Sequence, residues 1–165
     1  HITIKGDVEM EYRIETKEGF DLIGLLRTVT HDIETNYTGI PLFWNEVAMD
    51  GTVEKLGRLM NGKPAGLLGV GTYDEGKPAT YFIGVANESN QKTEFETYHI
   101  DAYTWAIFSG QGKMPDAIQD LGKRIMTEWL PTSGYEYADG PDIELYLNPN
   151  PQDAKFEIWV PVVKK

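Results

Sequence analysis

The sequence contains no cysteine and has few positive charges. The absence of cysteine excludes disulfides, thiolate catalysis and cysteine-based metal sites, and it favours a cytoplasmic location. The 15 Lys and Arg against 26 Asp and Glu give a net charge of -11. This charge, with no basic cluster, argues against direct binding of nucleic acid. No apolar run approaches the roughly 20 residues of a membrane span, so no membrane association is expected.

Signature motifs of several enzyme classes are also missing. The chain has no G-K-[ST] of a phosphate-binding loop, no G-x-S-x-G and no H-E-x-x-H. The glycines in residues 66–71, GLLGVG, lack the spacing and the following helix of a dinucleotide-binding turn. His31 and His99 are isolated in the sequence, which favours a structural role over metal ligation. We therefore expect neither a metal nor a cofactor.

Hydrophobic periodicity predicts an α+β fold in a single domain of residues 1–165. Pro41 suits the first turn of a helix, and Gly51 is expected to break or bend that helix. A second helix is predicted in residues 114–130, where apolar residues recur at helical spacing. Alternating or continuous apolar patterns predict strands in residues 8–16, 20–30, 66–74, 79–87 and 94–109 and a hairpin in 142–163.

The order of strands, helix and hairpin occurs twice. A shift of 75 residues lays the hairpin of residues 66–87 on that of residues 141–162, with both strands and their turn at one offset. This predicts two βαββ repeats, at about residues 8–88 and 93–163. The alternative is that two unrelated hairpins align because both alternate in apolarity.

The last hairpin carries carboxylates within apolar strands. Residues two apart in a strand share a face, so Glu144 and Tyr146 lie together, as do Glu157 and Trp159. If Asn148 pairs with Lys155, Glu144 faces Trp159 and Tyr146 faces Glu157. The alternate residues of both strands form a second, apolar face. We expect the helix to cover that face.

Three of the four corresponding positions in the first hairpin are glycines, Gly69, Gly71 and Gly84, and the fourth is Phe82. We interpret this as a groove between the hairpins, with one wall emptied and the other supplying aromatic rings and negative charge. Such a groove suits a hydrophobic cation, since ring faces attract cations. Trp44 and Trp105 are further candidate wall residues. The alternative is an ordinary solvent-facing sheet surface.

The C-terminal motifs resemble a known family. A helix ending in EWLPTSG, a strand with P-x-x-E-x-Y and a last strand EIWVPV are similar to the GyrI-like small-molecule-binding domain. That family includes the effector-binding domains of AraC-type and MerR-type (BmrR-like) regulators. The resemblance extends from about residue 10 to residue 163. Stand-alone members encoded on integron cassettes look closer still.

The resemblance implies a fold and a site. It implies two βαββ units around a pseudo-two-fold, with an antiparallel sheet, helices and a central cleft for hydrophobic cations. Glu144 occupies the position of the acidic ligand-reading residue, and Trp159 that of its aromatic neighbour. Tyr146, Phe82 and Trp105 fall where the family lines its pocket. Regulators also carry a DNA-binding domain, for which residues 1–19 are too short.

Three functions are compatible with these patterns. The favoured one is multidrug-type binding of hydrophobic, cationic small molecules without catalysis, with Glu144 as countercharge. The second is hydrolysis of strained-ring genotoxic compounds, with Glu144 as general base. The third is a protein-interaction role such as gyrase inhibition, which the acidic surface permits. The sequence leaves open a protein partner and a homo-dimer.

Overall fold

The computed structural model describes residues 2–4 and 8–165 of the chain. They form two compact units. The terminal unit contains the described residues before Gly19 together with Ala102–Lys165, and the inner unit is Gly19–Asp101. Each unit combines an antiparallel sheet with helices, so the predicted α+β class is confirmed.

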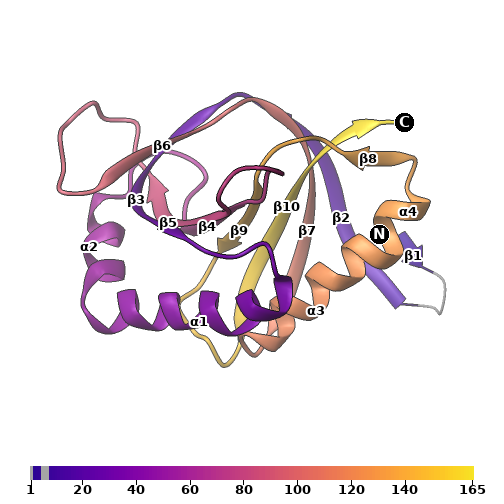
Figure 1. Ribbon diagram of the computed structural model, residues 1–165, viewed down its shortest axis with the longest axis horizontal. Helices are drawn as coiled ribbons and strands as arrows, with labels where there is room; N and C mark the ends of the chain where they lie inside the picture. The colour runs from indigo at the N-terminus through magenta and orange to yellow at the C-terminus, as the bar shows by residue number, and fades with distance from the viewer. Residues whose placement is uncertain (1, 5–7) are drawn as a thin grey trace. The chain divides into compact units, whose positions relative to one another are not determined.

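In the terminal unit, four strands pair antiparallel in the order β2 (Val8–Lys17), β7 (Tyr103–Gly112), β10 (Ala154–Lys164) and β9 (Asp142–Tyr146). The short strands β1 (Ile2–Ile4) and β8 (Tyr135–Tyr137) pair with β2 and β10. One continuous helical segment follows β7 and packs on β7 and β10 (Figure 1). It consists of α3 (Asp116–Arg124), the π-helical turn η1 (Ile125–Trp129) and α4 (Leu130–Thr132).

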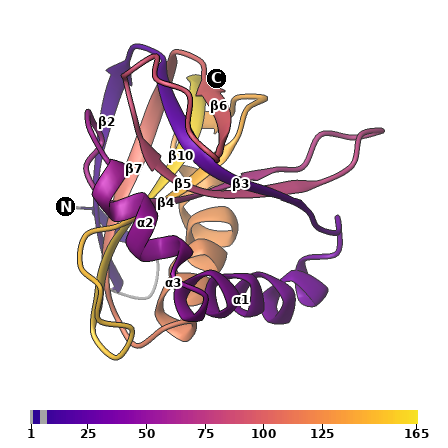
Figure 2. The same ribbon diagram turned by 90° about the vertical axis from the view of Figure 1, so that its left-hand side faces the viewer.

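In the inner unit, the strand order is β4 (Leu67–Thr72), β5 (Thr80–Ala86), β3 (Phe20–Thr28) and β6 (Glu96–Ile100). Helix α1 (Ile33–Met49) lies across one side of this sheet, as Figure 2 shows. Its buried Phe43 and Val47 pack against Tyr81 and Ile83 of β5. Helix α2 (Thr52–Leu59) buries Leu56 against Ile23 and Val85.

Strand exchange distinguishes these units from the predicted repeats at 8–88 and 93–163. Strand β2 precedes β3 in the chain but pairs with β7, whereas β6 precedes β7 but pairs with β3. The hairpins themselves keep the predicted offset of 75. The pair Leu68 and Gly84 of the inner unit corresponds to the pair Ile143 and Trp159 of the terminal unit.

Several predicted boundaries were wrong. Helix α1 begins at Ile33, well before Pro41, because Asp32 caps it by accepting from the backbone N–H of Glu34. Pro41 lies inside the helix, where it removes one backbone hydrogen bond. The strand predicted over residues 94–109 is two strands, β6 and β7, and the loop after α4 contains β8. Gly51 does separate α1 from α2, with a left-handed φ of 88°.

Across the described residues, no helix combines the length and apolarity needed to cross a membrane.

Two glycines allow β3 and β5 to approach closely. Gly24 and Gly84 are paired across the ladder. A Cβ on Gly24 would lie 2.0 Å from the Ile83 carbonyl oxygen and 2.7 Å from the Gly84 Cα. A Cβ on Gly84 would lie 2.2 Å from the Ile23 carbonyl oxygen. Backbone contact between the strands therefore accounts for Gly84, which the sequence led us to interpret as an emptied groove wall.

We predict that Gly24→Ala destabilises the fold by about 1–3 kcal/mol, since the backbone of β5 has to move. Gly39→Ala in α1 is the matched control, because nothing lies within 4 Å of its added Cβ. That exchange should stabilise the helix by up to about 1 kcal/mol. Urea unfolding of both variants measures the difference. Equal stabilities would contradict the close approach.

Candidate functional site

The register between β9 and β10 decides which side chains lie together. Glu144 is opposite Ile158, and Trp159 is opposite Ile143. The predicted pairing of Glu144 with Trp159 is therefore wrong by one residue. The cause lies in the turn, where the Lys155 backbone N–H bonds the side-chain oxygen of Asn148 and its carbonyl accepts from the Leu147 N–H. Asn148 thus contacts Lys155 through its side chain and is not its ladder partner.

A one-residue shift moves Glu144 and Tyr146 to the other face of the sheet. Directly opposite residues share a face, so these two lie with Ile158 and Phe156. Ile158 and Phe156 belong to the core beneath the helical segment, together with Ile118, Ile125 and Trp129, and Tyr146 packs against that core. Glu144 and Tyr146 therefore lie on the helix side of the terminal sheet, where the sequence led us to expect only apolar residues.

Asp142 adds a second carboxyl to this side. It lies two residues before Glu144 on β9 and so shares its face. The residue is half-buried, and its Oδ1 is shielded from solvent without a hydrogen-bond partner among the described residues. Burial raises the pKa of Asp142 to about 7, and the charge of Glu144 acts in the same direction, while a hydrogen bond from Tyr137 opposes the shift.

Burial and the charge of Glu144 also affect Tyr146. Burial raises the pKa of Tyr146 well above its usual value, and the negative charge of Glu144 adds to this. The charge of Glu144 thus acts on both Asp142 and Tyr146. We name Asp142, Glu144, Tyr146 and Tyr137 the β9 cluster. Its two carboxyls share a face of the sheet with the apolar residues Ile158 and Phe156.

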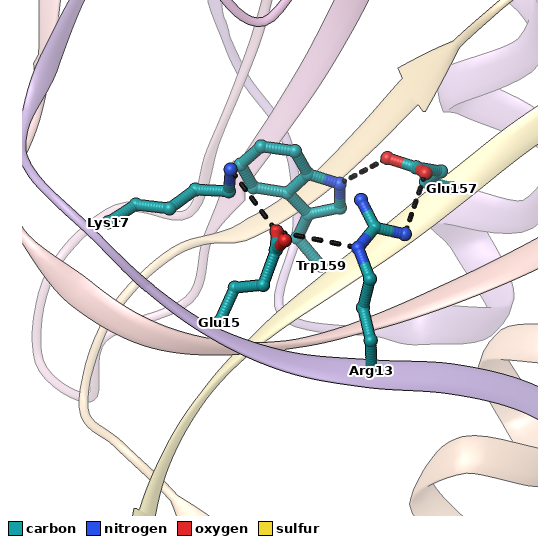
Figure 3. Close-up of polar contacts among 5 residues, drawn as sticks. All are labelled: Arg13, Glu15, Lys17, Glu157 and Trp159. Atoms are coloured by element: carbon teal, nitrogen blue, oxygen red, sulfur yellow. Dashed lines mark hydrogen bonds and ion pairs between the residues drawn. The ribbon is translucent and has the colours of Figure 1, made fainter.

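The other face of the terminal sheet carries a different network (Figure 3). Glu157 accepts from the Trp159 indole N–H at 3.0 Å and from Arg13 Nη1 at 3.1 Å. Its side chain is only 12% exposed. Glu15 joins Arg13 at 3.4 Å and Lys17 at 3.2 Å. The negative charge of Glu157 is therefore balanced within the chain.

Aromatic rings complete this second face. Trp159 and Trp105 are both buried, with ring centroids 5.7 Å apart, and Tyr103 lies 5.2 Å from Trp105. The Lys17 ammonium lies 5.1 Å from the Trp159 ring centroid (Figure 3). A lysine of the chain thus already makes the cation–π contact that we expected a ligand to make there. Trp159, Trp105 and Glu157 share this face, but the structure does not bring them together with Glu144.

The two remaining predicted residues lie in the inner unit. Trp44 of α1 donates its indole N–H to the Tyr81 hydroxyl at 3.0 Å and packs against the core between α1 and β5. Phe82, next to Tyr81 on β5, points to the opposite face. It is fully buried, with its ring 4.9 Å from that of Tyr98. Within this unit, Trp44 is therefore on the helix side of the sheet and Phe82 is not.

Sequence reasoning missed several residues near Glu144. Asp142 was visible in the motif PDIELY, where its spacing from Glu144 places both on one face of a strand. An aromatic cluster on the same side could not be read from spacing, because its members come from β2, β7, η1 and β8. In it, the Trp129 ring lies against Tyr12, Phe108 and Tyr135 at centroid distances of 5.2, 4.9 and 6.1 Å.

No group of three or more potential metal ligands gathers in the part of the chain that the structure describes.

Comparison with known families shows to which family the chain belongs. Residues 13–162 match the family model described as integron-associated effector binding protein. The chain belongs to this family. The match confirms the resemblance to GyrI-like and integron-cassette proteins that the C-terminal motifs indicated. Among curated protein sequences, none matches the chain significantly.

Several solved structures share the fold of this chain. SAV2435 bound to tetraphenylphosphonium is 22% identical with a TM-score of 0.80, over 93% of this chain and 94% of that one. The integron cassette protein of Vibrio cholerae is 16% identical with a TM-score of 0.66, over 97% of both chains. The C-terminal domain of EcmrR is 17% identical with a TM-score of 0.63, over 96% and 100%. At these identities the comparison establishes the fold.

We predict that Asp142→Asn stabilises the protein more at high pH than at low pH. Because the folded pKa of about 7 exceeds the unfolded value, the folded state binds more protons between about pH 4 and pH 7. The contribution of Asp142 to stability therefore falls as pH rises through that window. At about 1.4 kcal/mol per pKa unit, the gain from the variant should be up to about 3 kcal/mol larger at pH 8 than at pH 5.

Urea unfolding of wild type and variant at both pH values measures this. A gain independent of pH would show that Asp142 ionises normally in the folded protein.

Proposed function

We propose that the protein binds hydrophobic, cationic small molecules at the β9 cluster. The observation that carries this proposal is the placement of Asp142 and Glu144 on one face of β9, beside Tyr146 and the aromatic core under the helical segment. Two carboxyls in such surroundings disfavour negative charge, as the raised pKa of Asp142 indicates. A ligand with positive charge and apolar surface suits carboxyls in such surroundings.

Membership of an effector-binding family supports a small-molecule ligand. SAV2435, a protein of the same fold, has been solved with tetraphenylphosphonium, a hydrophobic monocation. We extend that chemistry to this chain because the β9 cluster offers both of its requirements. Carboxylates provide the countercharge, and the tyrosines provide ring faces worth about 0.5–2 kcal/mol each toward a cation.

The surface of Trp159 and Glu157 is a weaker candidate for the cation. Arg13 neutralises Glu157, and Lys17 lies over Trp159, so an incoming ligand would have to displace charges of the chain. Trp105 and Phe82 are fully buried on faces away from the helices of their units. We assign these four residues to the scaffold that supports the strands, and Glu144 and Tyr146 to the ligand.

Two glutamates of the same hairpin provide a matched test. We predict that Glu144→Gln weakens tetraphenylphosphonium binding by about tenfold to a hundredfold, because a partly buried countercharge is lost. Glu157→Gln should change it less than about twofold, since Glu157 lies on the other face and is paired with Arg13. Titration followed by tryptophan fluorescence measures both. Triphenylphosphine oxide, a neutral compound of similar shape, should distinguish little between Glu144→Gln and wild type.

Equal losses in Glu144→Gln and Glu157→Gln would refute the assignment to the β9 face. A larger loss in Glu157→Gln would place the cation beside Trp159 instead.

One observation also favours hydrolysis as a second candidate function. A carboxyl with a pKa of about 7 is well matched to general acid–base work at neutral pH, and Asp142 has that property. In this version Asp142, rather than the Glu144 expected from the sequence, activates the attacking water. Incubation with strained-ring electrophiles should then give product that an Asp142→Asn variant does not form. Equal background rates for the two proteins would remove hydrolysis from consideration.

A further inference from the structure

Asp142 and Glu144 form a pair of carboxyls on one face of β9, and the surroundings of Asp142 make its ionisation unfavourable. Asp142 Oδ1 is buried and has no donor among the described residues. An ionised carboxylate in that position would be desolvated and would have one oxygen without a donor, which is costly. Nearby Glu144 makes a second negative charge less favourable still. A proton on Asp142 removes both penalties.

The groups around Asp142 support a neutral carboxyl in the ligand-free protein. From β8, the Tyr137 hydroxyl contacts Asp142 but also donates to the Gly140 carbonyl oxygen. A hydroxyl has a single proton, so it cannot donate fully to both. If the register of β9 with β10 continues by one more pair, Asp142 lies opposite Val160, which is apolar. On β9 itself the nearest charge is Glu144, which is negative. Of the lysines and arginines in the described part of the chain, none is among the groups acting on Asp142.

We infer that Asp142 is a second ligand carboxyl of the cation site, which gives up its proton to solvent when the cation binds. The exchange is balanced: a neutral acid and a free monocation become a carboxylate, a bound monocation and a released proton. One positive charge replaces another, so the net charge of the two carboxyls and their occupant stays at -1. This inference rests on the proposed function, and it makes Asp142 a determinant of selectivity, since a neutral ligand cannot drive the exchange.

Proton release has a distinctive pH dependence. Below a pH of about 7 Asp142 starts protonated, so up to one proton leaves per cation bound. Affinity then rises by up to about tenfold per pH unit and levels off above that pH, where the carboxylate is already present. A cation that binds without deprotonating a carboxyl gives no such rise.

Isothermal titration calorimetry with tetraphenylphosphonium chloride tests the inference. Titrations at about pH 6 in two buffers of different ionisation enthalpy give the number of protons released. We expect a value approaching one in wild type at about pH 6 and near zero at about pH 8.5. Asp142→Asn should bind without releasing protons, with an affinity that barely changes with pH. Glu157→Gln, on the other face, should release protons as wild type does.

A second variant keeps the test decisive if Asp142→Asn folds poorly. Because the Tyr137 hydrogen bond lowers the pKa of Asp142, Tyr137→Phe should shift the midpoint of proton release to higher pH. Binding with no proton release in wild type, or with the same release in Asp142→Asn, overturns the inference and leaves cation binding intact. A midpoint unmoved in Tyr137→Phe also counts against it. Absence of tetraphenylphosphonium binding to wild type at either pH refutes the proposed function itself.

Discussion

The pairing of β9 with β10 is the constraint on which the candidate site depends. Because side chains alternate along a strand, the register assigns each residue of β9 to one of two faces, and a shift of one residue reverses every assignment. The observed register sets Glu144 against Ile158 and thereby places it on the side covered by α3 and η1. The side chain of Asn148, bonded to the Lys155 backbone, holds this register at the turn.

Local sequence patterns predicted much of the fold. They located the main helical regions and most strands, and the offset of 75 between the hairpins agrees with the observed registers. The register itself could not be predicted, because β9 is buried on both faces. Ile143 and Leu145 are buried on one side, while Tyr146 packs into the core on the other. Alternation of apolar and polar residues indicates which face of a strand is buried only where the opposite face is exposed to solvent.

The pairing of strands far apart in the chain could not be predicted from the sequence either. The exchange of β2 and β6 between the two sequence repeats joins residues 72 to 98 positions apart. No local pattern distinguishes that pairing from a hairpin of β2 with β3. The same limitation concealed Arg13, whose bond to Glu157 determines that this glutamate is internally neutralised. Sequence reasoning singled out Glu144 and Glu157 and treated them as alike, because Arg13, the partner of Glu157, lies on another strand.

The contrast between the two glutamates shows how one hairpin can combine stability with binding. Glu157 lies in a network with Arg13 and Trp159, where paired charges and the indole N–H satisfy its oxygens, so it can remain ionised without an external partner. The Asp142 and Glu144 pair lies where negative charge is disfavoured. In our interpretation Asp142 carries a proton while no ligand is bound. A fully ionised pair would lower the stability of the free protein, whereas an apolar replacement would abolish the preference for cations. A protonatable second carboxyl avoids both outcomes, because it is neutral when the site is empty and charged when a cation is present.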